Sequence, residues 1–273
     1  MKIYVIGLTT YREIVRRFQF WLLLLAASAL LVLFCFIPYY TFGEDIKMVK
    51  DQGLAVIMLS GLLVGLFAAS SAIADEIEGK TAMTLLSKPI RRRDFIIGKF
   101  AGIMAAVGLL FVILGVVMAL MLFYKAGYEA GENKTDMPSY SERLVMLWQT
   151  APALLLTYFQ VTILCALSVA FSTRLPLHLN LTACIIIFFL GHLAPQLVWA
   201  STQGQLNEVV RFMAELFALV LPGLEYFNVG PAISTDARVP WLEYVLPCFG
   251  YTILYSSIAL LLALFLFEDR DLA

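Results

Sequence analysis

Six long apolar stretches divide this chain, and polar or charged residues separate them. They cover residues 18–42, 54–74, 100–124, 151–173, 175–201 and 244–267. About 20 consecutive apolar residues cross a bilayer as an α-helix, so every stretch is long enough to do so. Lipid offers the backbone no hydrogen-bond partners, whereas a helix satisfies its own polar groups. The pattern therefore predicts an all-α polytopic membrane protein whose six transmembrane helices form one domain, residues 1–273.

The composition excludes several other classes of protein. Of the 273 residues, 61% are hydrophobic and 14% are charged, whereas a soluble domain of this length needs far more charge on its surface. The net charge of −1 provides no basic field, so a nucleic-acid partner is not expected. The cysteines lie far apart inside the apolar stretches, which predicts neither a metal site nor a disulfide framework. They are Cys35, Cys165, Cys184 and Cys248.

A short amphipathic segment, residues 1–17, precedes the first span. Its apolar positions recur three or four residues apart, and basic residues occupy the rest of each turn. The apolar positions are Ile3, Gly7, Tyr11, Ile14 and Phe18. Such a helix lies along a membrane surface, so the segment is predicted to form a cytoplasmic elbow helix. The alternative interpretation is a plain basic flank of the first span.

A second amphipathic segment, residues 202–243, lies between the fifth and sixth spans. Its apolar residues recur at helical spacing opposite Glu208, Arg211 and Glu215. The segment is too short to cross the membrane twice. A re-entrant or interfacial helix in the outer leaflet is therefore predicted.

The distribution of Lys and Arg predicts the orientation. Basic loops stay in the cytoplasm, and both termini belong to the more basic set of loops, with 12 basic residues against 7. The larger set comprises Lys2, Arg12, Arg16, Arg17, Lys80, Lys88, Arg91, Arg92, Arg93, Lys99, Arg174 and Arg270. The smaller set comprises Lys47, Lys50, Lys125, Lys134, Arg143, Arg211 and Arg238. Both termini are therefore predicted to be cytoplasmic.

The most informative polar segment, residues 75–99, joins the second and third spans. Acidic residues follow the second span, a short helix with apolar residues is expected over residues 81–87, and Pro89 ends it. A short helix with exposed apolar side chains, held between two membrane helices, suits docking into a groove of a partner. An ordinary basic cytoplasmic loop is the alternative interpretation.

The same segment contains a false nucleotide-binding motif. Gly79-Lys80-Thr81 matches the last residues of a phosphate-binding loop, but Ala74 stands where that motif requires its first glycine. A membrane helix, rather than a strand, precedes it, and the neighbouring carboxylates would repel phosphates. Nucleotide binding by this chain is therefore not expected.

The order of residues in this segment is typical of one transporter family. Its members read approximately E-x-E-x-x-T, followed by L-L-S-x-P-[IV]-x-R-x-x-F-x-x-G-K. The corresponding residues are Glu76, Glu78, Thr81, Leu85, Leu86, Ser87, Pro89, Ile90, Arg92, Phe95, Gly98 and Lys99. The chain resembles, over its whole length, the permease of an ABC exporter of the type-2 kind. Lys80 departs from the glycine that many members have there, and residues 221–228 resemble a weaker outer pattern.

The resemblance implies a mechanism that composition alone does not. Two permease chains would pair in the cytoplasmic (inner) membrane of a bacterium, and two separate ATP-binding subunits would dock on them. ATP would be bound by these partners, so the chain itself would hold no cofactor, metal or catalytic site. The residues expected to couple the permease to the ATPase are Glu76, Glu78, Thr81, Leu85, Leu86 and Arg92. The alternative is a non-transporting scaffold on the same fold, serving assembly, secretion or gliding machinery.

Within the spans, glycines and histidines are the remaining candidates. The pairs Gly61 and Gly65, and Gly98 and Gly102, are small residues spaced for close helix packing, within one chain or between two. The two histidines lie 14 residues apart in the fifth span, close to four turns, and so share a face. Ionisable groups at membrane depth are functional candidates, which makes His178 and His192 candidates for a transport pathway. No carboxylate lies within a predicted span, which argues against a proton-driven carrier.

Overall fold

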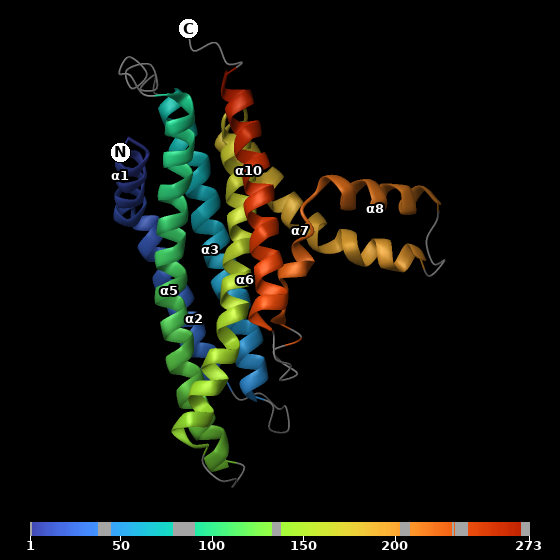
Figure 1. The fold of residues 1–273 in the computed structure, drawn as a ribbon. Helices are drawn as coiled ribbons and strands as arrows, with labels where there is room; N and C mark the ends of the chain where they lie inside the picture. Colours follow the sequence, from blue (N-terminus) through green and yellow to red (C-terminus); the bar gives the residue numbers. More distant parts are fainter. Residues whose placement is uncertain are drawn as a thin grey trace.

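In a computed structural model of the chain, the described residues form helices and no strand (Figure 1). The structure describes residues 2–37, 45–78, 91–132, 138–202, 208–230, 232 and 240–268, with the backbone alone for residues 73–78, 129, 132, 201, 202, 208 and 268. Six helices are long and apolar enough to cross a membrane. They comprise Phe18–Phe36, Asp45–Ala72, Arg92–Tyr128, Tyr140–Ser172, Leu177–Ala200 and Trp241–Phe267. The predicted all-α polytopic fold is therefore confirmed.

The predicted elbow is present as helix α1 (Lys2–Arg16), followed by α2 (Phe18–Phe36). Arg17 between them has an extended backbone, with φ −68° and ψ 136°, so the chain turns there. The buried side of α1 lies against the first third of α5 (Arg92–Glu132), as Figure 1 shows. Its place at a membrane surface stays a prediction.

Helices α3 (Asp45–Glu78) and α6 (Tyr140–Ser172) extend well past their predicted spans, which began at residues 54 and 151. Asp45 at the start of α3 pairs with the buried Lys125 of α5, with 2.9 Å between Oδ2 and Nζ. Each charge is therefore stabilised by the other rather than by water. Helix α6 begins at a capping box, in which the Ser139 hydroxyl and the Glu142 carboxylate satisfy the first backbone N–H groups. Apolar length alone therefore predicted these two starts too late.

Helix α7 (Leu177–Thr202) leaves the bundle, and α8 (Glu208–Val220) folds back beside it (Figure 1). We call these two projecting helices the arm. Only 17% of the most apolar part of α7 is buried, against 67% in α3 and in α6, which form the centre of the bundle. The arm therefore offers its apolar side chains to lipid or to another chain. Helix α8 falls within the predicted outer segment.

Contacts between distant residues define the two ends of the bundle. At one end, Arg92 Nη1 donates to the carbonyl oxygen of Phe267, 3.4 Å away, so the start of α5 meets the end of α10 (Leu246–Glu268). At the other end, the pairing of Asp45 with Lys125 joins the start of α3 to the end of α5. Helices α3, α5 and α6 therefore alternate in direction and α10 ends beside the end of α6, whereas α7 leaves the bundle (Figure 1).

Candidate functional site: a cavity beside the arm

Residues 221–230 carry the chain from the arm back to the bundle, through a 3-10 helix, η1 (Leu224–Phe227). Leu224 and Phe227 are buried. Gly191 of α7 permits this approach, because a Cβ there would lie 2.8 Å from the carbonyl oxygen of Pro222. Residues 221–228, whose sequence resembles the weaker outer pattern, thus form a wall between the arm and the bundle.

A cavity of about 370 Å³ lies where this wall meets α3, α6 and α7. Its polar lining residues are Asp51, Thr157, Gln160, His192 and Asn228. Its other lining residues are Leu54, Ala55, Met58, Ala153, Phe188, Phe189, Phe227, Val229 and Gly230. Sites for small molecules have volumes of roughly 300–1,000 Å³ and combine apolar walls with a few convergent polar groups. The cavity therefore has the size and composition of a ligand site.

His192 is held in one orientation at this cavity. Its Nδ1 lies 2.8 Å from the carbonyl oxygen of Phe188, so that nitrogen donates a hydrogen bond. Its Nε2 lies 3.0 Å from the amide nitrogen of Gln160, so it accepts one from Gln160, itself buried. Both ring nitrogens are therefore engaged in hydrogen bonds within the protein. His192 therefore orients Gln160 and shapes the wall, and neither of its nitrogens is free to bind a metal.

Asp51 is a charged residue of this cavity that the sequence did not reveal, and Thr157 and Gln160 were not predicted either. Asp51 was placed outside the second span because that span was predicted to begin at residue 54. The carboxylate of Asp51 lies so close to Gly230 that a Cβ there would be 2.7 Å from its Oδ1. No ion pair to Asp51 is found among the described residues. Its one sequence signal was an acidic residue a single helical turn before an apolar run.

The two histidines do not share a site. His178 lies in the first turn of α7, where it is exposed and its carbonyl oxygen accepts a hydrogen bond from Thr182. It does not line the cavity, whereas His192 does. Within the described part of the chain, no three His, Cys, Asp or Glu side chains gather to hold a metal ion.

Of the predicted coupling residues, the structure describes Glu76, Glu78 and Arg92, at the end of the bundle remote from the cavity. Glu76 and Glu78 fall in the last turn of α3, where the backbone alone is described. Thr81, Leu85 and Leu86 lie outside the described residues. The short helix expected over residues 81–87 also lies outside the described residues.

Arg92 has contacts within the chain. Besides donating to the Phe267 carbonyl oxygen, its guanidinium lies 5.7 Å from the centre of the Phe267 ring. Arg174, between α6 and α7, donates from Nε to the carbonyl oxygen of Leu266 at 3.0 Å. Cations at a helix C-terminus complement its partial negative charge. Arg92 therefore helps hold the end of α10, a role that the sequence pattern did not reveal.

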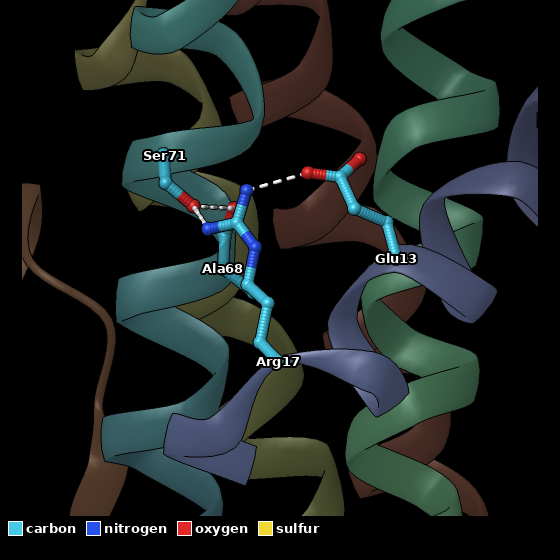
Figure 2. Close-up of polar contacts among 4 residues, drawn as sticks. All are labelled: Glu13, Arg17, Ala68 and Ser71. Carbon is cyan, nitrogen blue, oxygen red and sulfur yellow. Dashed lines mark hydrogen bonds and ion pairs between the residues drawn. The ribbon is translucent and has the colours of Figure 1, made fainter.

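Arg17 links the elbow to the bundle at this same end (Figure 2). Its Nη1 donates to Ser71 Oγ of α3 at 2.6 Å, and its Nη2 pairs with the Glu13 carboxylate of α1. Ser71 Oγ in turn lies 3.5 Å from the carbonyl oxygen of Ala68 (Figure 2). One side chain at the α1–α2 joint therefore contacts both the elbow and the last third of α3.

The comparison with protein families identifies this architecture. A family described as ABC-2 family transporter protein matches residues 26–272, from within α2 to the end of the bundle and beyond. The chain belongs to the ABC-2 transporter family. No curated protein matches its sequence. The family match and the six apolar helices together make this permease a multi-pass membrane protein.

In this ABC-2 permease, the four predicted packing glycines contact neighbouring helices of the same chain. A Cβ at Gly61 would meet the Phe111 ring, and a Cβ at Gly65 would meet the Cys165 sulfur. The other pair faces the elbow. A Cβ at Gly98 would lie 2.9 Å from Ile6 side-chain atoms, and one at Gly102 would lie 2.5 Å from the Gly7 carbonyl oxygen. Both pairs thus contribute to packing within one chain.

Proposed function

We propose that this permease forms the translocation path of an ATP-driven exporter in the cytoplasmic membrane of a bacterium. The observation that carries the proposal is the ABC-2 family match over residues 26–272, since it includes all six apolar helices at least in part, as well as the segment between α3 and α5. Transport subunits of this family imply a separate ATP-binding partner in general. Docking of that partner on residues 75–99 is the coupling that we propose.

The shape of α3 supports this coupling. It is one continuous helix of 34 residues, with Glu76 and Glu78 at one end and Asp51 of the cavity near the other. A helix of this length is about 50 Å long, at 1.5 Å per residue. A displacement of the coupling loop would therefore reach the cavity along a single rigid element. Arg17 and Arg92 brace the coupling end against α1 and α10.

We further propose that two permease chains and two ATP-binding subunits form the complete exporter. The arm supports this proposal, because exposed apolar side chains extend along both of its helices. They include Ile186, Phe189, Leu193, Trp199, Val209, Phe212, Leu216 and Leu219. A second permease chain would give these side chains a partner where one chain alone leaves them uncovered.

Replacing Leu85 and Leu86 together with serine tests the coupling. Burying two leucines against a partner is worth about 3–6 kcal/mol before the costs of association. We expect the double variant to insert normally but to lose its ATP-binding subunit during purification in mild detergent, and to lose ATP-driven transport. The matched control replaces Leu144 and Leu242, both exposed, with serine and should retain the subunit.

Native mass spectrometry of the parent complex, from the same preparation, should give two permeases and two ATP-binding subunits. Full retention of the ATPase by the double variant would show that residues 75–99 are not the coupling element. An ATPase that copurifies without any ATP-dependent transport would instead favour the scaffold.

A further inference from the structure

The cavity beside the arm combines one carboxylate with several aromatic rings. Asp51 lies at its edge, and Phe188, Phe189 and Phe227 form much of its apolar wall. Asp51 and Phe189 are exposed, so the carboxylate and one ring are accessible from outside the protein. An aromatic ring attracts a cation through its negative face, and a carboxylate attracts one directly. Both features therefore favour the same kind of ligand.

Among the residues that the structure describes, no group of the cavity pairs with Asp51. Both ring nitrogens of His192 bond elsewhere, to the Phe188 carbonyl oxygen and to Gln160. The buried Lys125 pairs with Asp45, six residues before Asp51 on α3, and does not line the cavity. Thr157 donates its hydroxyl proton to the Ala153 carbonyl oxygen. The carboxylate thus lies beside an apolar wall, where water weakens its attraction for a cation less than in bulk solution.

Charge and shape together decide between ligand classes. An anion would be repelled by Asp51, and an uncharged apolar molecule would leave the carboxylate facing hydrocarbon. A hydrated metal ion requires several ligands, whereas the cavity offers one carboxylate and an imidazole with no free nitrogen. An organic cation with an apolar body would place its charge at the Asp51 carboxylate and its apolar part against the phenylalanine rings.

We propose that this cavity binds a lipophilic organic cation, whose charge lies at Asp51 and whose body lies against the phenylalanine rings. The binding itself is independent of coupling. Only the conclusion that such cations are the cargo rests on the proposed export function. The inference adds a ligand class to the permease and makes Asp51 the residue that selects it.

The test uses two probes of nearly equal size and opposite charge, tetraphenylphosphonium and tetraphenylborate. Equilibrium dialysis of the purified full-length chain in detergent, with protein-free micelles as the blank, measures the binding of each. We expect Asp51→Asn to weaken phosphonium binding at least tenfold. The matched control Glu215→Gln removes an exposed carboxylate on the arm and should leave binding unchanged. Phe189→Leu, at an exposed position, should weaken phosphonium binding severalfold.

Retention of the ATP-binding subunit is scored on the same variants. Selective loss of phosphonium binding in Asp51→Asn and Phe189→Leu, with normal thermal unfolding, supports the cation site. Equal binding of the two probes, or parental phosphonium affinity in both variants, overturns it. Because Asp51 lies toward the opposite end of α3 from Glu76 and Glu78, Asp51→Asn should keep its ATPase. A failure of the cation site is thereby distinguishable from a failure of the coupling.

Discussion

Asn180 illustrates how a single polar side chain can fix the packing of three membrane helices. It is fully buried near the start of α7, and its amide nitrogen lies 2.8 Å from Ser70 Oγ of α3. The same nitrogen lies 3.0 and 3.1 Å from the carbonyl and hydroxyl oxygens of Ser168 in α6. Its Oδ1 accepts from the Cys184 thiol at 3.5 Å. This network anchors the first turns of α7 to the bundle, although the rest of α7 projects away.

We predict that Asn180→Leu destabilises the protein by about 1–2 kcal/mol. Hydrogen bonds between membrane helices contribute up to about this much, and the two serine hydroxyls would lose a buried partner. The matched control is Gln196→Leu, an exposed position on the same helix, which should be close to neutral. Unfolding in mixed micelles, followed by circular dichroism, measures both. Equal stability of the two variants would contradict a structural role for the network.

At the scale of elements, the contact between α1 and α5 depends on the absence of side chains. Gly7 of α1 faces Gly98 and Gly102 of α5, and the neighbouring Thr10 is buried there. The backbones approach closely because no Cβ separates them, which is how small residues act in membrane helix pairs. The elbow is thus a packed part of the bundle, and Arg17 fixes its other end to α3.

We predict that Gly102→Ala loosens the elbow. The new Cβ would lie 2.5 Å from the Gly7 carbonyl oxygen, and overpacking of this kind costs about 1–3 kcal/mol. Trypsin should then cleave after the exposed Arg12 and Arg16 several times faster. Gly250→Ala is the control, because a Cβ at Gly250 meets nothing within 4 Å. Unchanged cleavage in Gly102→Ala would show that the elbow does not depend on this contact.

At the scale of the whole molecule, the structure assigns the loops to two ends. The start of α5, the turn between α6 and α7, and the end of α10 lie together, because Arg92 and Arg174 both bond to the last carbonyls of α10. At the other end, the rings of Trp148 and Trp241 lie 5.4 Å apart. This grouping agrees with the division into more and less basic loops, and the cytoplasmic side stays a prediction.

Reporter fusions test the orientation directly. A reporter joined after Ala273 should report the cytoplasm, and one inserted between residues 125 and 148 should report the outside, because 12 basic residues lie on the predicted inner side and 7 on the outer side. Insertion of the same reporter within the arm, between α7 and α8, should also report the outside. Two fusions at opposite ends of the bundle that report the same side would contradict the six crossings.

The sequence by itself determined the number of apolar helices and the amphipathic helix before the first of them, and it predicted a coupling segment. These depend on the length and period of apolar residues, which are local properties of the chain. Only the tertiary structure decided which residues form the cavity, because Asp51, Gln160, His192 and Asn228 come together through packing of separate segments. For the same reason, only the structure showed that Arg92 of α5 contacts the end of α10 and that His178 lies apart from the cavity that His192 lines. It also showed that α3 begins at Asp45. A buried charge such as Asp45 can start a helix only where a distant residue such as Lys125 lies beside it, and no local pattern encodes that neighbour.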